Sequence, residues 1–337
     1  MKAPSITILT GTLNPSLATF TRMLESIKLQ QYDGSVEHII LDGGSTNGSQ
    51  ELAKEYRCMI LTFRNSINEG GDRMYKGILK SHGEILLLLE SDNFLVGRDW
   101  LSLLVEPFKN PRVFSTYPAY NDYEKDMNIL TRYTALIGAP EPTLFFLKKS
   151  DKIPRTQMMY DKGTILSENS HYYTVKFNSL NLTTMGDNGF MVRKNVLEKV
   201  IFKGKTYFHT DAFRMLLDLG YDTYGVTKNS IIHTTKTNMV STVMRRIQVK
   251  RHFSDDLRGT RKYLVFNWHS TEDWLRLFVY IFFSLTLIQP VIFSIRGYRK
   301  IPDVAWFFHP IMCFVMVIGY MISEIEYQMK NLNQKLI

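Results

Sequence analysis

The sequence predicts an α/β protein with a doubly wound, mostly parallel sheet, followed by a C-terminal hydrophobic helical hairpin. Strand and helix signals alternate over residues 1–95. The run EILLLL at residues 84–89 is almost wholly apolar, as expected for a central parallel strand that is covered on both faces. After residue 273, two long segments carry no Asp, Glu, Lys or Arg, which predicts apolar helices.

The elements of the N-terminal part follow from local patterns. The run SITILT at residues 5–10 is rich in β-branched residues and predicts the first strand. Apolar residues then recur at helical spacing, which predicts a helix over residues 17–29. The same signals predict further strands at 36–41, 59–63 and 84–89, and helices at 49–56 and 72–81. Repeated units of this length predict parallel strands with right-handed crossovers, and a ligand site beyond the carboxyl ends of the strands.

Residues 95–235 predict mixed α and β structure with an irregular middle. The expected elements are strands at 190–192, 224–226 and 230–233, and helices at 195–200 and 213–219, the second closed by Gly220. The predicted organisation is therefore one α/β domain over residues 1–240, with halves of about 1–95 and 96–240. A basic segment at 241–273, a hydrophobic hairpin at 274–325 and a polar tail at 326–337 follow.

The chain is basic, with 41 Lys and Arg against 32 Asp and Glu. The excess gathers at Arg245, Arg246, Lys250, Arg251, Arg258, Arg261 and Lys262. A diphosphate, anionic lipid or nucleic acid would suit this charge, and a merely solvated face is the alternative. Its place before an apolar segment favours lipid, and no nucleic-acid-binding motif accompanies it, so no nucleic-acid partner is expected.

Two cysteines, Cys58 and Cys313, predict no disulfide framework and fit a reducing compartment. No signal peptide is expected at the N-terminus.

The hydrophobic hairpin comprises residues 277–295 and 304–322. Thirteen Leu, Ile, Phe and Val in the first segment contribute about −4 to −8 kcal/mol to membrane insertion, of which Gln289 and Pro290 remove a part. His309 and Pro310 weaken the second segment. We expect both to span a membrane, with the basic regions cytoplasmic. Interfacial or re-entrant helices, or a buried hairpin, are the alternatives.

Polar residues at the ends of the predicted strands indicate the chemistry. Glu90 and Asp92 flank Ser91 directly after the apolar strand, and such a pair can hold Mg²⁺ or Mn²⁺ against a diphosphate. A solvated turn is the alternative. Asp42 precedes Gly43 and Gly44, which would let a nucleobase or ribose approach, although Asp-Gly also forms Asx turns. Thr10, Thr12 and the 65–72 loop complete this predicted edge.

These residues together resemble a known family. The motifs SITILTGTLN, HIILDGGSTNGS and GDRMYKGILKSHGEILLLLESDN resemble the donor half of family 2 inverting glycosyltransferases of the GT-A fold. The likeness covers residues 4–95 closely and 185–235 more loosely. It implies a nucleoside-diphosphate-sugar donor and a divalent metal. Together with the hairpin, it implies a polyprenyl-phosphate or lipid-linked glycan acceptor at a membrane.

The resemblance also implies residue roles. Asp42 would contact the nucleobase and Asp72 would shape the donor site, with Glu90 and Asp92 on the metal. The acceptor side would be formed by Gly186, Asp187, Asn188 and Arg193. The basic residues Arg245, Arg246 and Arg251 would close over a diphosphate or lipid phosphate.

The sequence departs from the family pattern at three places. Glu90 stands where Asp is usual, and Tyr75 where Asn is usual. The Glu-Asp pair that supplies the catalytic base is not intact. We expect Asp211 to be the base, with His209 as the second candidate, and a phosphate acceptor would need no strong base. His233 is a candidate metal or phosphate ligand, or a structural histidine. A nucleotidyltransferase and a non-catalytic membrane scaffold are the other interpretations.

Overall fold

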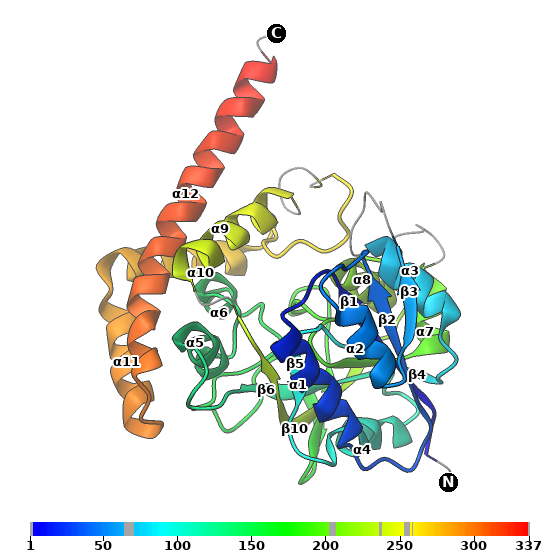
Figure 1. Ribbon diagram of the computed structural model, residues 1–337. Helices are drawn as coiled ribbons and strands as arrows, with labels where there is room; N and C mark the ends of the chain where they lie inside the picture. The colour runs from blue at the N-terminus through cyan, green and yellow to red at the C-terminus, as the bar shows by residue number, and fades with distance from the viewer. Residues whose placement is uncertain are drawn as a thin grey trace. The chain divides into compact units, whose positions relative to one another are not determined.

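The computed structural model describes residues 3–63, 71–201, 207–235, 238–252, 257 and 259–335 (Figure 1). The chain forms two compact units. The first consists of Met1–Asp122 and Met159–Thr234, and the second of Tyr123–Met158 and Thr235–Ile337. Residues 123–158, which the sequence placed in the α/β domain, therefore group with the C-terminal region.

The first unit is built on one mixed sheet. Its strands are β1 (Ile6–Thr12), β2 (Val36–Asp42), β3 (Met59–Thr62), β4 (Ile85–Leu88), β5 (Asn93–Leu95), β6 (Ser115–Asp122), β7 (Thr164–Glu168), β8 (Tyr172–Lys176), β9 (Phe190–Arg193) and β10 (Thr223–His233). Their order is β3-β2-β1-β4-β9-β6-β10-β8-β7, and β5 pairs with β10. Strands β1 to β4, β6 and β10 share one direction, and β9 runs against its neighbours β4 and β6.

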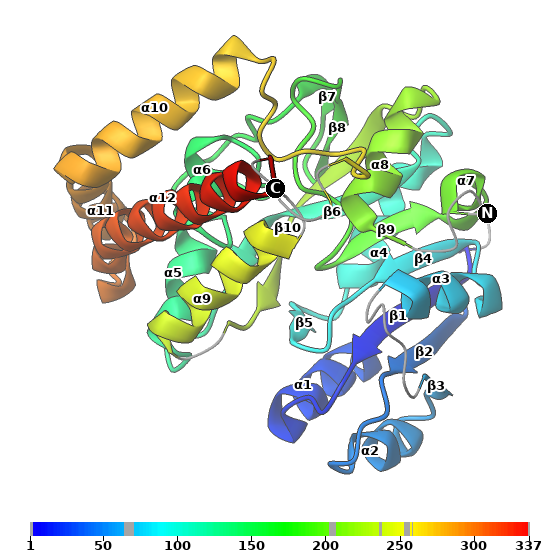
Figure 2. The ribbon, with the colours of Figure 1, turned by 90° about the horizontal axis from the view of Figure 1, so that it is seen from above.

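The helices of this unit are α1 (Leu17–Lys28), α2 (Ser49–Glu55), α3 (Gly71–Lys80), α4 (Trp100–Val105), α7 (Lys194–Ile201) and α8 (His209–Asp218). Figure 2 shows β1, β2 and β4 side by side among them. The predicted α/β alternation is confirmed, because each strand and helix expected within residues 1–95 is present with small shifts at its ends. The two strands expected at 224–226 and 230–233 are one strand, β10, with an irregularity between Thr227 and Ser230.

The second unit is helical. Its elements are α5 (Ile129–Ile137), α6 (Pro142–Phe146), α9 (Met239–Val249), α10 (Thr271–Thr286), α11 (Ile288–Lys300), the 3₁₀ turn η3 (Val304–Phe307) and α12 (Phe308–Lys335). Its core forms around the buried Trp306, which packs with residues of α5, α9 and α12. Figures 1 and 2 both show α11 beside the first part of α12.

The first predicted apolar segment is not one straight helix. It breaks at Leu287, which adopts φ 60°, and the axes of α10 and α11 differ by 81°. Pro290 explains the break, because proline lacks an N–H and its ring clashes with the carbonyl four residues earlier. Within the described residues, one continuous helix, Val304–Lys330, is long and apolar enough to cross a membrane, and the bent pair meets the same criterion only if its two arms count as one span.

Candidate active site

Polar side chains of the first unit gather at one edge of the sheet. Because β1, β2, β4 and β10 run in the same direction, their carboxyl ends meet there and bring Thr12, Asp42, the Glu90–Asp92 turn and His233 to one edge. Strand β9 runs the other way, so the turn that precedes it, which contains Asp187, reaches the same edge. This is where parallel α/β sheets bind their ligands.

Asp42 organises the loop that follows β2. One of its carboxylate oxygens accepts hydrogen bonds from the backbone N–H groups of Gly44 and Ser45, at 2.7 and 2.8 Å, and from Gln50. The other accepts from the hydroxyls of Thr12, at 3.1 Å, and Ser45. Burial would raise the pKa of Asp42, but these hydrogen bonds hold it below its ordinary value. The Asx-turn alternative therefore describes Asp42 well, and its contact with a nucleobase stays a prediction.

Two residues near this loop differ from the sequence-based expectation. Thr10 does not lie in the site, because its fully buried hydroxyl bonds to His38 at 3.0 Å in a network that also includes Cys58. Arg73 was not predicted, yet its guanidinium donates to the carbonyl of Thr12 at 2.7 Å and lies against Gly43. Its neighbour Asp72, the expected donor-site residue, is the second residue of α3 and is partly buried.

The Glu90–Asp92 turn is fixed by Asn93. The Asn93 amide oxygen accepts from the Glu90 backbone N–H at 3.1 Å, and the Asn93 N–H donates back to the Glu90 carbonyl. His233, at the end of β10, directs its Nε2 to within 3.7 Å of an Asp92 carboxylate oxygen. Ser91 lies between the two acidic residues and is partly buried. Glu90, Asp92 and His233 therefore lie near one another, and their predicted role as metal ligands stays a prediction.

The turn before β9 depends on residues with unusual backbone angles. Gly186, Asn188 and Gly189 have φ values of 109°, 51° and 88°, a region that favours glycine and tolerates asparagine. A Cβ at Gly186 would meet the Phe213 ring at 2.6 Å, so the turn packs tightly on α8. This geometry holds the partly exposed Asp187 carboxylate at the edge of the sheet.

The first turn of α8 supplies the two expected bases. His209 opens the helix, its side chain is 40% exposed, and its Nε2 lies 3.9 Å from Asp187. Asp211 is 7% exposed, and it makes interactions within the protein. Of the two, only His209 is therefore accessible to a substrate in this structure.

Charges of one sign dominate around Glu90. Burial, and then the nearby carboxylates of Asp187 and Asp92, raise the pKa of Glu90, while His233 and Arg73 partly offset them, and the result is a pKa of about 7. Tyr207 belongs to the same group, since burial and then the charges of Asp187 and Glu90 raise the pKa of its phenol well above its ordinary value.

Two polar atoms near these charges lack a protein partner. Within the described part of the chain, the buried Tyr207 hydroxyl and the buried Asn188 amide oxygen accept or donate no hydrogen bond. Buried polar atoms are normally satisfied, so such atoms beside a cluster of charges are typical of a ligand site. Neither residue's hydrogen-bonding role could be read from the sequence, because it depends on the packing of α8 and the β9 turn.

The acidic residues fit a divalent cation that a diphosphate helps to hold. In the described ranges, no three His, Cys, Asp or Glu side chains are placed to form a metal site by themselves, so the expected trio of Glu90, Asp92 and His233 is not assembled as such. Mg²⁺ and Mn²⁺ often bind through one or two carboxylates plus substrate phosphates, and mutually repelling carboxylates are stabilised by such an ion.

Other predicted residues lie elsewhere. Arg193 ends β9 opposite Ile85, at the far edge of the sheet, where it donates to the carbonyls of Val113 and Phe108. Its expected place on the acceptor side is therefore wrong, because β9 is antiparallel.

The basic residues of α9 and its C-terminal extension belong to the second unit. Arg251 pairs with Glu326, and Lys250 pairs with Glu324 of α12 at 2.7 Å. Arg245 is exposed and Arg246 is partly buried. Arg258 lies outside the described residues, as does most of the 65–72 loop.

Comparison with known proteins identifies the family of this chain. Residues 7–200 match the family model described as glycosyl transferase family 2. Uncharacterized glycosyltransferases of two Mycobacterium tuberculosis strains are 33% identical over 107 residues, which is 31% of this chain and 40% of theirs. A mannosyltransferase from Pyrobaculum calidifontis, solved with GDP-Man and Mn²⁺, has 13% identity and a TM-score of 0.53 over 95% of this chain and 87% of that one.

The structural likeness confirms the predicted α/β fold as that of GT-A proteins. The matched curated relatives extend well beyond the aligned region, since it spans less than half of their length. The family model, in contrast, covers more than half of this chain and includes β1 to β4, the Glu90–Asp92 turn and the β9 turn. The chain belongs to glycosyl transferase family 2.

Proposed function

We propose that the protein is an inverting, metal-dependent glycosyltransferase that moves a sugar from a nucleoside-diphosphate sugar to a lipid-linked acceptor at the cytoplasmic face of a membrane. The observation that carries the catalytic part is the acidic cluster of Glu90, Asp92 and Asp187 at the ligand-binding edge of the sheet. Family membership and the fold of the GDP-Man-bound relative support a nucleotide-sugar donor.

Each residue has a proposed task. Glu90 and Asp92 would hold Mg²⁺ or Mn²⁺, which when bound neutralises charge on the departing diphosphate. Arg73, between the end of β1 and Glu90, adds a fixed positive charge on the same side. The Asp42 loop gives the nucleoside a preformed surface. Within the described residues, the Tyr207 hydroxyl and the Asn188 amide oxygen have no hydrogen-bond partner, and both are buried beside the cluster, so they would meet a sugar hydroxyl only if the site opens locally.

His209 is the proposed general base for a hydroxyl acceptor. The acceptor oxygen attacks the anomeric carbon, its proton passes to His209 Nε2, and the bond from the anomeric carbon to the diphosphate oxygen breaks with its electrons on the diphosphate. Asp187, 3.9 Å from that nitrogen, would stabilise the imidazolium that forms when Nε2 takes the proton. This replaces our first expectation, Asp211, because Asp211 is buried.

The acceptor and the membrane are supported by the second unit. Its long apolar helix Val304–Lys330 and its exposed apolar side chains fit a lipid environment, and its basic residues fit a cytoplasmic orientation. The proposal of a lipid-linked acceptor is based on the membrane location of the second unit, and not on any residue on the acceptor side of the site. A non-lipid glycan acceptor is the second candidate.

The test is sugar transfer by membranes that contain the full chain. Labelled UDP- and GDP-sugars are supplied with Mg²⁺ or Mn²⁺, and label is measured in the organic extract. Label that is lost in Asp92→Asn but kept in Glu51→Gln, an exposed carboxylate on α2, supports the proposal. Nucleotide release without lipid label would favour the non-lipid acceptor. Absence of turnover with every donor would favour a non-catalytic scaffold.

A pair of variants tests the base. With a hydroxyl acceptor, His209→Asn should lower kcat about 10²- to 10⁴-fold, the usual contribution of a general base. Asp211→Asn should act mainly through stability, with a lower Tm and a smaller change in kcat. The reverse order of effects would restore Asp211 as the base.

A further inference from the structure

The helices α10 and α11 carry their large apolar side chains on the outside. Leu275, Phe278 and Ile288 are 64%, 66% and 54% exposed. The exposed set continues with Trp274, Phe282, Leu285, Val291, Ile292, Ile295 and Tyr298. A helix on the surface of a soluble protein shows the opposite arrangement, with polar residues outside.

The inner faces of the same helices are small or polar. The buried residues are Asp273, Tyr280 and Ser284 on α10, and Pro290, Ser294 and Gly297 on α11. Helices in membranes pack through small and hydroxyl-bearing residues, because lipid is as apolar as the large side chains that face it. The distribution in both helices therefore fits a lipid surface better than a second protein surface.

Specific contacts require those small residues. The Ser294 hydroxyl donates to the Trp306 carbonyl at 2.7 Å. A Cβ at Gly297 would lie 2.5 Å from the Trp306 ring. These contacts fix α11 against η3, so the outward direction of its large side chains follows from the packing.

The lengths of α10 and α11 and the angle between them determine how far the apex of the pair extends from its two outer ends. The arms contain 16 and 13 residues, which makes them about 24 and 20 Å long, each shorter than the roughly 30 Å hydrocarbon core. With a bend of 81°, the apex stands about 14 Å above the line that joins the two outer ends. This height equals roughly one leaflet.

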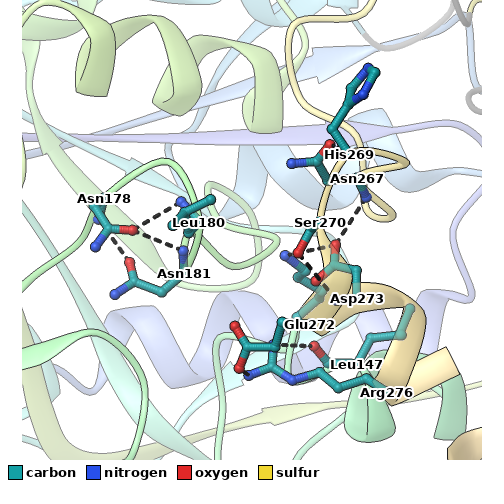
Figure 3. Close-up of polar contacts among 11 residues, drawn as sticks. Leu147, Asn178, Leu180, Asn181, Asn267, His269, Ser270, Glu272, Asp273 and Arg276 are labelled. Atoms are coloured by element: carbon teal, nitrogen blue, oxygen red, sulfur yellow. Dashed lines mark hydrogen bonds and ion pairs between the residues drawn. The ribbon is translucent and has the colours of Figure 1, made fainter.

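Both outer ends contact the same polar segment of the second unit, residues 147–156. At the start of α10, Arg276 donates to the Leu147 carbonyl at 3.2 Å, as Figure 3 shows. Nearby, Lys149 pairs with Asp273 at 3.5 Å. At the end of α11, the Lys300 ammonium lies 3.4 Å from the Thr156 carbonyl. The two ends are therefore held at one level rather than on opposite sides of a bilayer.

The residues around the outer ends of α10 and α11 are basic and aromatic, as expected for the headgroup region of a lipid bilayer. Basic residues that are not buried gather there, namely Lys148, Arg155, Arg296, Arg299 and Lys300. Phe266, Trp268 and Trp274 form an aromatic cluster at the start of α10, with ring centroids 5.0 to 5.4 Å apart. Aromatic rings and basic side chains are enriched at the interface between lipid and water.

We infer that the α10–α11 elbow enters a single leaflet of a phospholipid bilayer and returns to the side from which it came. The apex at Leu287 and Ile288 lies among the acyl chains, and Glu272 and Arg299 lie at the same surface. This inference rests on the membrane association in the proposed function, but not on the reaction. It also removes the difficulty that a spanning hairpin would place the basic 296–300 segment on the far side.

Cysteine labelling in sealed membrane vesicles tests the topology. The full chain carries Cys58→Ser, and the fully buried Cys313 is kept, with this parent as the background control. Glu272→Cys, Arg299→Cys and Ile288→Cys are added singly and exposed to a membrane-impermeant maleimide. We expect the first two to be labelled from the same side and the third to be labelled only after detergent is added. Labelling of the first two from opposite sides would overturn the elbow in favour of a broken span.

A second measurement identifies what covers the apex. A fluorophore on Ile288→Cys is reconstituted in phosphatidylcholine–phosphatidylglycerol vesicles that carry a nitroxide either at the headgroup or near the chain end. Chain-end nitroxide should quench it more strongly, whereas a fluorophore on Leu29→Cys, an exposed apolar position in the first unit, should be insensitive to both. Cross-linking of Ile288→Cys to a second copy, without quenching, would overturn lipid as the occupant.

The outcomes separate the elbow from the proposed function. Protein that is released from membranes by salt and labelled freely at Ile288→Cys would remove both the elbow and the membrane location. Opposite-side labelling with lipid transfer intact would remove the elbow alone. Same-side labelling without any transfer would leave the elbow standing and remove the proposed reaction.

Discussion

The substitution Glu90→Gln tests whether the acidic cluster lowers the stability of the protein while it supports sugar transfer. The pKa of Glu90 is raised from 4.5 to about 7 by burial and by the charges of Asp187 and Asp92. For an acid whose pKa is higher in the folded state, the folded protein binds more protons between these two values. The contribution of Glu90 to stability is therefore highest below about pH 4.5, falls as the pH rises to about 7, and levels off above it.

The size of this effect follows from the shift. A pKa difference of this size corresponds to an upper limit of about 3 kcal/mol at pH 8, and partial solvent access reduces it to about 1–3 kcal/mol. Glutamine keeps the shape of the side chain and carries no charge. Without metal, Glu90→Gln should therefore raise the free energy of unfolding at pH 8 by about that amount, with little change at pH 4.5.

The assay is Tm of the full chain in detergent with a chelator, at pH 4.5, 6 and 8. Glu51→Gln, which removes an exposed carboxylate, serves as the control and should change Tm little. Mn²⁺ with a nucleoside diphosphate should raise the Tm of the parent protein and not that of Glu90→Gln, which should also lack transfer activity. A Glu90→Gln protein that is less stable than the parent at pH 8, or a difference that does not depend on pH, would refute the reasoning.

Three further changes probe packing that the site and the elbow need. Gly186→Ala should lower transfer at least tenfold, because its φ of 109° and the contact at 2.6 Å force the Asp187 turn to move, and circular dichroism should show the fold retained. Gly297→Leu should lower Tm by overpacking against Trp306, at a cost of about 1–3 kcal/mol, whereas a smaller loss for Gly297→Ala would show that volume is responsible. Lys149→Met should destabilise the second unit by about 3–5 kcal/mol because it leaves Asp273 charged and buried, and adding Asp273→Leu should restore part of the loss in a chemical denaturation series.

The sequence predicted those features that depend on local patterns. The alternation of strands and helices over residues 1–95 was readable because each element has its own hydrophobic period and turn residues. Asp42, Glu90 and Asp92 were expected at one edge because parallel strands present their carboxyl ends together. The structure brings these three residues to one edge as expected, and their roles in the reaction stay predictions.

Features that depend on long-range pairing were not accessible in the same way. Arg193 was placed in the site because it follows the Asp187 motif closely, but the antiparallel direction of β9 carries it to the far edge. The direction of a strand is set by its neighbours and leaves no mark in its own residues. Arg73 was missed because only the docking of α3 on the sheet brings its guanidinium to Thr12.

The break in the first apolar segment is a different case, because its signal was present. Pro290 lowers the expected insertion energy of the segment, and the same residue interrupts the helix because it lacks an N–H and its ring clashes with the preceding turn. The grouping of residues 123–158 with the C-terminal region had no such signal, since it arises from contacts such as Arg132 with Asp303 and Tyr133 with His309. Such contacts join segments far apart in the chain and follow only from the fold.

The acidic cluster also argues against a protein that keeps the fold without the reaction. Glu90, Asp92 and Asp187 repel one another, and His233 and Arg73 compensate only in part. A scaffold would gain stability from a neutral residue of the same shape at position 90, because the Glu90 carboxylate is buried beside two other carboxylates. A divalent cation bound with a diphosphate would attract each of the three carboxylates. Their proximity, which is unfavourable in the empty site, would then be favourable. The arrangement therefore costs stability in the empty site and is favourable in a loaded site, which is the state in which a glycosyltransferase works.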